Sequence, residues 1–79
     1  MIVKVKLYGT LGRSIDGYTH SSGLDLTLAE GSTIDDLLDH FNLVPERLGM
    51  VSMDGKPLQT NDLLKDGVLV KIFQPIFGG

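Results

Sequence analysis

Alternation of apolar and polar residues marks three segments of the chain as strands with one buried face. In residues 2–8 one face carries Val3, Val5 and Leu7, and the other carries Lys4, Lys6 and Tyr8. The same alternation turns two further sets inward, Leu24, Leu26 and Leu28 in residues 24–28 and Val68, Val70 and Ile72 in residues 68–73. A period of two residues is typical of a strand with one covered and one exposed face. We predict strands over all three segments, the first two paired as a hairpin with a long loop.

A helix is predicted after the second strand. One apolar stripe at helical spacing is formed by Ile34, Leu37, Leu38 and Phe41. Ser32 and Asp35 have the spacing of a capping box, which predicts where the helix begins. Asp35 and Asp36 lie in the first turn, where the helix dipole favours negative charge. We expect the helix to end near Asn42, ahead of Pro45.

Short elements are expected between the helix and the last strand. Residues 48–53 are predicted to be a short strand, and Asp54-Gly55 the tight turn that follows it. Residues 56–58 can form only an edge strand, because Pro57 has no backbone N–H to donate to a neighbour. One helical turn is expected over residues 61–64. Asp66-Gly67 is expected to turn the chain into the last strand.

The order of these elements predicts an α+β fold. Residues 9–23 are rich in glycine and serine and are expected to form a loop, with Ile15 and Tyr18 available to pin it. Around this loop the order is strand, strand, helix, then two or three short strands. We therefore predict a mixed four- to five-stranded sheet packed on one main helix, with the other face of the sheet exposed.

Composition limits the classes of function. A chain of 79 residues forms one domain, and the absence of Cys removes disulfides, thiolate metal sites and a catalytic thiol. A net charge of −3 with no basic run argues against nucleic acid and anionic membranes as partners. The sequence has no signal-peptide pattern and no apolar run of transmembrane length, so we expect a cytoplasmic protein.

The chain ends in Gly78-Gly79, directly after the predicted last strand. No backbone must turn beyond a terminus, so the conformational freedom of glycine has no structural use there. A carboxylate on a flexible, unhindered tether is a chemical handle. We predict that residues 1–74 form the body and residues 75–79 an exposed flexible tail that does the chemical work. The alternative is a frayed terminus without function.

Other candidate sites are weak. Residues 9–14 (GTLGRS) have two glycines but lack the lysine and the spacing of a phosphate-binding loop, so a plain loop is expected. Asp36 and His40 are four residues apart on the predicted helix, but two ligands without a third favour a solvated helix face over a metal site. His20 has no acid or nucleophile near it in sequence, which argues against a catalytic role.

Element order, chain length and ending together resemble the MoaD/ThiS family of ubiquitin-like sulfur carrier proteins. The resemblance is carried by residues 73–79 (FQPIFGG) and by residues 3–11 (VKVKLYGTL), which look like the molybdopterin branch. It implies a ubiquitin-like β-grasp fold, in which the first and last strands are parallel neighbours at the centre of the sheet. Tyr8 and Phe73 would then lie together beside the tail. They would form either a docking surface for a partner or a cross-strand pair that only stabilises the sheet.

The resemblance also implies a carrier and not an enzyme. Carriers of this family are adenylated at the terminal carboxylate, here that of Gly79, by an ATP-dependent activating enzyme. A sulfur donor then displaces AMP and leaves a thiocarboxylate. The carrier would bind no cofactor of its own, because the partner enzyme uses the ATP. Gly78 would keep the tail slim, Pro75 would stiffen its root, and Ile76 and Phe77 would pack on a partner channel or fold back on the sheet.

The receiving pathway stays open at this point. The molybdopterin branch is favoured, with the large subunit of molybdopterin synthase as the sulfur acceptor. A carrier for thiamine biosynthesis, which serves thiazole synthase, would use the same tail chemistry. A ubiquitin-like modifier joined to lysines through Gly79 is a second alternative, and a free-standing interaction module with a dispensable tail is a third. An autonomous enzyme is disfavoured, because the chain has two isolated His and no Cys.

Overall fold

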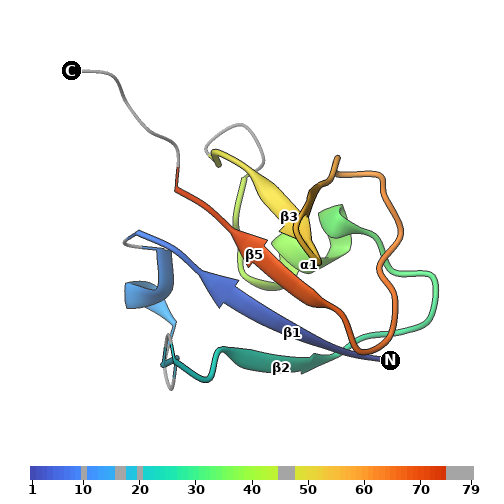
Figure 1. The fold of residues 1–79 in the computed structure, drawn as a ribbon, viewed down its shortest axis with the longest axis horizontal. Coiled ribbons are helices and arrows are strands. Elements are labelled where there is room, and N and C mark those ends of the chain that lie inside the picture. The colour runs from blue at the N-terminus through green and yellow to red at the C-terminus, as the bar shows by residue number, and fades with distance from the viewer. Residues whose placement is uncertain (10, 16–17, 20, 45–47, 75–79) are drawn as a thin grey trace.

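The computed structural model describes residues 1–9, 11–15, 18–19, 21–44 and 48–74 (Figure 1). Its elements are β1 (Ile2–Leu7), the 3-10 helix η1 (Leu11–Ser14), β2 (Leu24–Thr27), α1 (Ile34–His40), β3 (Val51–Met53), β4 (Lys56–Pro57) and β5 (Leu69–Ile72). The order and type of the main elements confirm the α+β prediction. In the part of the chain that the structure describes, no helix has the length and apolar character needed to cross a bilayer.

The five strands form one mixed sheet in the order β2-β1-β5-β3-β4. β1 and β2 are antiparallel, as expected for the long-looped hairpin. β1 and β5, the first and last strands, are parallel neighbours at the centre, with Val5 opposite Val70 and Leu7 opposite Ile72. β5 is antiparallel to β3, and β3 is antiparallel to the short edge strand β4. The central parallel pair confirms the topology that the family resemblance implied.

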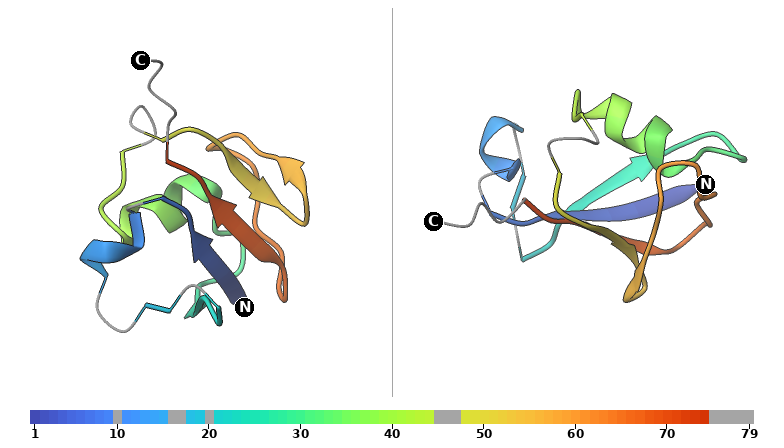
Figure 2. Two further views of the ribbon diagram at one scale, coloured as in Figure 1. Left: turned by 60° about the vertical axis from the view of Figure 1, so that its left-hand side comes forward. Right: turned by 90° about the horizontal axis from the view of Figure 1, so that it is seen from above.

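The core lies between the sheet and α1, which crosses one face of the sheet (Figure 2). The most deeply buried side chains come from the two central strands and the helix: Val3, Val5, Leu7, Ile34, Leu37, Leu38, Val70 and Ile72, each at most 2% exposed. Full burial of a side chain of this size contributes about 1.5–3 kcal/mol. The alternating pattern therefore places the inward residues correctly, and Phe41 closes the helical stripe as a partly buried neighbour of the core.

The helix begins one residue later than the sequence indicated. Thr33, and not Ser32, is the N-cap. Its backbone N–H donates to the Asp36 carboxylate at 2.9 Å, and the Asp36 N–H donates to the Thr33 hydroxyl at 3.3 Å. The Ser32 hydroxyl instead donates to the Ala29 carbonyl oxygen at 2.7 Å. The capping box is thus Thr33 with Asp36, and the predicted pairing of Ser32 with Asp35 is wrong.

A tertiary contact explains this shift. Thr33 forms an isolated antiparallel bridge with Leu63, and the backbone N–H of Ile34 donates to the Asp62 carbonyl oxygen at 3.0 Å. This pairing holds Thr33 extended, at φ −104° and ψ 173°, so the helix starts after it. The same contact overturns the helical turn expected over residues 61–64, because that segment pairs with residues 32–34 instead of coiling on itself. At its other end α1 stops at His40, and Asn42 adopts φ 58°.

The short elements after the helix differ in extent from the predictions. The strand expected over residues 48–53 covers only Val51–Met53. Asp54 at φ 51° and Gly55 at φ 85° form the tight turn that was predicted. Lys56 and Pro57 follow as the edge strand, also as predicted. The last strand was expected over residues 68–73 and is observed over Leu69–Ile72.

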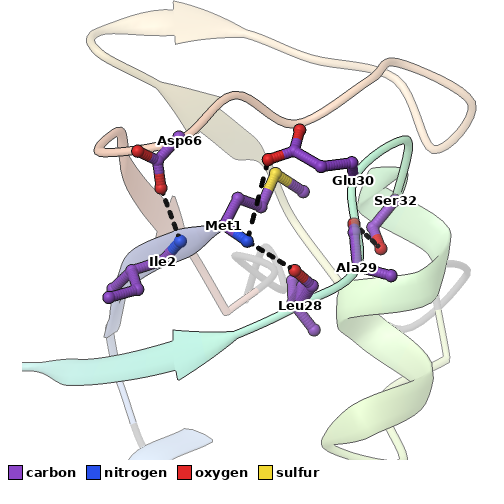
Figure 3. A network of polar contacts seen from close by, with 7 residues as sticks. All are labelled: Met1, Ile2, Leu28, Ala29, Glu30, Ser32 and Asp66. Carbon is purple, nitrogen blue, oxygen red and sulfur yellow. Dashed lines mark hydrogen bonds and ion pairs between the residues drawn. The ribbon is translucent and has the colours of Figure 1, made fainter.

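The start of the chain is tied to both neighbours of β1 (Figure 3). The Met1 ammonium group donates to the Leu28 carbonyl oxygen at 2.8 Å and lies 3.8 Å from the Glu30 carboxylate. The Ile2 N–H donates to the Asp66 carboxylate at 2.6 Å. Leu28 ends the second strand region and Asp66 precedes β5, so these contacts fix the register of three segments at one end of the sheet.

The corrected cap gives a stability prediction. We expect Thr33→Ala to lower the free energy of unfolding by about 1 kcal/mol, because it removes the oxygen that accepts from the Asp36 N–H. Ser32→Ala is the matched control and should have a smaller effect, since its hydroxyl bonds only to Ala29. Urea unfolding followed by circular dichroism measures both. An equal or larger effect of Ser32→Ala would contradict the assignment of the cap.

Candidate functional site

The last described residues, Phe73 and Gln74, follow β5, which lies in the middle of the sheet. β5 runs away from the end where Met1 lies, so Phe73 and Gln74 are at the opposite end of the molecule (Figure 1). Backbone bonds continue past the strand. The Phe73 N–H donates to the Met50 carbonyl oxygen at 2.8 Å, and the Gly49 N–H donates to the Phe73 carbonyl oxygen at 2.9 Å. Phe73 is therefore held by its main chain, and Gln74 is the last described residue before the predicted tail.

Two aromatic rings meet beside this point. Tyr8 and Phe73 stack with their ring centroids 4.6 Å apart and their planes 18° apart. The Tyr8 N–H donates to the Ile72 carbonyl oxygen at 2.9 Å, which extends the parallel pairing of β1 and β5 by one residue. Both rings lie on the face of the sheet away from α1, because Leu7 and Ile72 next to them are buried on the helix side. The expected juxtaposition of Tyr8 and Phe73 is confirmed, while their role stays a prediction.

Gly9 brings the chain close under the tail root. It has φ 72°, which favours glycine, and a Cβ added to it would lie 2.9 Å from the Cβ of Gln74. Any other residue would therefore be strained in its backbone and would also displace Gln74. The turn after β1 and the residue before the tail pack directly on each other, which fixes where the tail starts.

A pocket of about 440 Å³ opens beside the stacked rings. It is lined by Tyr8, Gly9, Gly49, Met50, Phe73 and Gln74. Met50 is 45% exposed, so apolar surface is open to solvent at this pocket. Sequence reasoning missed Gly49 and Met50, since they appeared only as the start of a strand. The alternating pattern gave no signal for them, because Ser52, two residues after Met50 on the same face, is itself buried.

The loop behind the site is anchored by Tyr18. β2 ends its pairing at Leu24, opposite Val5, so the backbone groups of Leu7 lie beyond the end of that ladder. The Tyr18 hydroxyl forms hydrogen bonds with both backbone groups. It accepts from the Leu7 N–H at 2.7 Å and donates to the Leu7 carbonyl oxygen at 3.0 Å. Ile15 packs against the core. The prediction that Ile15 and Tyr18 pin the loop is confirmed, and the end of β1 that carries Tyr8 is thereby fixed.

Comparison with known proteins gives the family. The model of the ThiS family matches residues 7–79. The chain belongs to the ThiS family. No protein of curated function matches the sequence of this ThiS-family chain at a significant level. The match begins at Leu7, the last residue of β1, and extends through the rest of the chain to the terminal Gly78-Gly79.

Solved structures show the fold of this ThiS-family chain. SAMP1 from Haloferax volcanii is 18% identical, with a TM-score of 0.74 and full coverage of both chains. The putative molybdopterin converting factor subunit 1 from Pyrococcus furiosus is 20% identical, with a TM-score of 0.76 and coverage of 96% of this chain and 99% of that one. Subunits 1 and 2 of molybdopterin-converting factor from Helicobacter pylori form a complex whose matching chain is 16% identical, with a TM-score of 0.62 and full coverage of both chains. The ubiquitin-like β-grasp fold and the MoaD/ThiS resemblance are confirmed.

The remaining candidate residues are distributed as follows. His20 and the five predicted tail residues lie outside the described residues; the tail residues are Pro75, Ile76, Phe77, Gly78 and Gly79. Asp36 is engaged in the cap, and the His40 ring lies edge-on to Phe41 at 5.2 Å. Across the described ranges, no three His, Asp or Glu side chains gather closely enough to hold a metal ion. Residues 9–14 were expected to be a plain loop, but within them Leu11–Ser14 forms a 3-10 helix.

The contact between Gly9 and Gln74 can be tested by paired substitutions. Gly9→Ala and Gly31→Ala both place a Cβ at positive φ, which costs about 1–2 kcal/mol. Nothing lies within 4 Å of a Cβ at Gly31, whereas at Gly9 it meets Gln74. We expect Gly9→Ala to lower the free energy of unfolding more than Gly31→Ala, as measured by urea unfolding. Equal losses would mean that the tail root does not rest on Gly9.

The stacked pair can be tested by a double-mutant cycle. We expect Tyr8→Leu and Phe73→Leu to be coupled by about 0.5–1.5 kcal/mol in the free energy of unfolding, as for stacked rings. The same four proteins should be assayed as substrates of the activating enzyme. If the rings only stabilise the sheet, KM for the folded variants will equal that of the wild type. If they form a docking surface, KM will rise in each single variant.

Proposed function

We propose that this ThiS-family chain is a sulfur carrier that holds the sulfur on the terminal carbonyl carbon of Gly79. The observation that carries the proposal is the family match, which extends through Gly78-Gly79 to the last residue. The fixed tail root supports it. Phe73 is held by backbone bonds to Gly49 and Met50, so the five residues from Pro75 start from a defined point on a rigid sheet.

The chemistry needs activation by a partner, because a carboxylate is a poor electrophile. An oxygen of the Gly79 carboxylate attacks the α-phosphorus of ATP on an activating enzyme, and pyrophosphate leaves. Sulfur at the oxidation level of hydrosulfide, supplied by the sulfur donor, then attacks the acyl carbon of the adenylate, AMP leaves with the bonding electron pair, and the sulfur loses its proton. The product is a thiocarboxylate. ATP and catalytic groups belong to the partner, and the carrier binds no cofactor of its own in this proposal.

The contribution of the chain is reach and access. Five extended residues span at most about 17 Å, which is enough to thread a narrow channel into another protein. Gly78 and Gly79 have no Cβ to obstruct a nucleophile that approaches the terminal carbonyl. Pro75 restricts its own φ and the conformation of Gln74, so less entropy is lost when the tail is inserted. Capture of a C-terminal carboxylate by a partner is an established mode of recognition.

We propose the large subunit of molybdopterin synthase as the sulfur acceptor, with the exchange taking place in the cytoplasm. Support comes from the two structural neighbours that are molybdopterin converting factor subunits, one of them in a complex of subunits 1 and 2. Thiazole synthase is the alternative acceptor, since the same thiocarboxylate would serve it.

A second candidate function is protein modification. Its support is the structural similarity to small archaeal modifier protein 1 of Haloferax volcanii. In this function a lysine amine of a target attacks the same Gly79 adenylate, AMP leaves, and an isopeptide bond forms. Both functions share the activation step and differ in the nucleophile. Tryptic digests of the native cell would contain lysines carrying a remnant of the tail only if modification takes place.

Sulfur loading can be measured by intact-protein mass spectrometry. We expect co-expression with the activating enzyme and sulfur donor of the same organism to yield a species heavier by the difference between one sulfur and one oxygen atom. Removal of Gly78-Gly79 should abolish this species, because the shortened tail neither reaches the adenylation site nor ends unhindered. Gly31→Ala, which places its Cβ in open space before α1, is the control and should still be loaded. Full activity of the shortened chain in the cell would favour a free-standing interaction module instead.

A further inference from the structure

The pocket beside the stacked rings is an apolar site next to the residue that precedes the tail. Gln74 is one of its lining residues, together with Tyr8, Phe73 and Met50. We call it the root pocket. Its volume of about 440 Å³ lies within the range of pockets that hold an organic ligand. The site is therefore large enough for a guest, and the chain resumes its course directly at its rim.

The lining of the root pocket suits one kind of guest, an aromatic side chain. Aromatic rings favour offset or edge-to-face contact with other rings beyond the area that they bury, and Tyr8 and Phe73 are two such rings. A methionine side chain is flexible and forms favourable contacts between its sulfur and an aromatic ring. Met50 is 45% exposed, so it can make this contact with a guest. The residues of the pocket therefore favour a phenyl ring as its occupant.

The chain itself carries such a ring close by in sequence. It has three phenylalanines, of which Phe41 packs against the core and Phe73 belongs to the stacked pair. The third is Phe77, which follows Gln74 by three residues. The acyl chemistry at the terminal carbonyl needs no aromatic ring two residues earlier in the chain. The presence of Phe77 therefore needs an explanation of its own.

The sequence from Gln74 to Phe77 favours a β-turn. Proline has the φ that the second residue of a type I turn requires, and Pro75 holds that position. Ile76 is then the third residue, which a type I turn tolerates. In a β-turn the first and fourth Cα atoms, here those of Gln74 and Phe77, lie less than about 7 Å apart. Such a turn returns Phe77 to a residue that lines the root pocket.

We propose that the root pocket binds the Phe77 ring of its own chain and that the tail exchanges between this closed state and an open one. Burying one ring and ordering three residues change the free energy by similar amounts in opposite directions, so both states are populated. In the open state all five tail residues extend outward. In the closed state only Gly78 and Gly79 extend beyond the pocket, over at most about 7 Å. Closing therefore draws the terminal carboxylate back to the body.

The closed state controls access to the acyl end. This consequence rests on the proposed function, whereas the contact between Phe77 and the pocket does not. An enzyme channel can receive only the open tail, so its apparent affinity for the carrier falls by the fraction of chains that are open. A thiocarboxylate on Gly79 would likewise meet fewer unselective reagents between one enzyme and the next. The pocket thus shields the cargo at the cost of slower capture.

Tethering favours the ring of the same chain over the ring of a second copy. A group joined to its site by a short linker has an effective concentration of millimolar order. The linker here is Pro75 and Ile76, and the pocket begins at Gln74. A second copy would have to reach a similar concentration in solution before its tail could compete. The occupant in a dilute solution of the isolated protein is therefore the chain's own Phe77.

Methyl NMR of the isolated full-length chain tests the contact. The chain has three methionines, so isotope labelling of their methyl groups gives three signals, from Met1, Met50 and Met53. A ring in the root pocket shifts the Met50 signal through its ring current. We expect Phe77→Leu to move the Met50 signal and to leave the other two in place, which also shows that the variant is folded. Ile76→Leu is the matched control and should leave all three signals in place.

Each contrary result has a distinct meaning. A Met50 signal that stays unchanged in Phe77→Leu, or that moves as far in Ile76→Leu, would overturn the proposal. A signal that varies with protein concentration would overturn it too, because the ring would then come from a second copy. Nuclear relaxation of the Gly79 amide should show greater mobility in Phe77→Leu, and equal mobility would contradict the drawing back of the carboxylate.

No enzyme or sulfur donor takes part in this experiment. Failure of the chain to acquire sulfur in the mass measurement would therefore contradict the sulfur-carrier function and leave the closed state intact. Loss of the Met50 shift would in turn leave the carrier function intact.

Discussion

The parallel pairing of β1 with β5 is the contact on which the rest of the structure depends. It joins the two ends of the chain at the centre of the sheet and sets Val5 against Val70 and Leu7 against Ile72 in the core under α1. The same register places the Tyr8 ring beside the Phe73 ring on the other face. A tail at the sheet edge would start from a strand that is free to fray. Here it starts from a strand with neighbours on both sides.

The two faces of the sheet have different tasks. α1 has only seven residues, yet together with the sheet it excludes water from the inward-facing apolar side chains of the central strands. The opposite face carries lysines, two stacked rings and a pocket, none of which the core requires. A domain of this size has little stability to spare.

Much of the fold could be predicted from the sequence, because the alternating strands and the helical stripe are local patterns. The predictions that failed depended on contacts between residues that are distant in the sequence. Ser32 with Asp35 and Thr33 with Asp36 have the same spacing, and only the bridge between Thr33 and Leu63 selects the second pair. Residues 61–64 do not form the expected helical turn, because the same bridge pairs them with the start of α1. Of the candidate site, the meeting of Tyr8 and Phe73 followed from the family resemblance, which makes the first and last strands neighbours. Gly49 and Met50 enter the site through backbone bonds to Phe73 that no local pattern reveals.

The central place of β5 has a consequence for synthesis. Translation proceeds from the N-terminus, and β5 is the last strand to be made, yet it lies between β1 and β3. A nascent chain can form the β1–β2 hairpin and α1, but the sheet stays in two halves until residues 69–72 have left the ribosome. A product truncated before residue 69 would lack both the closing strand and the terminal glycines. Such a chain would neither complete the sheet nor compete with the finished protein for its processing enzymes.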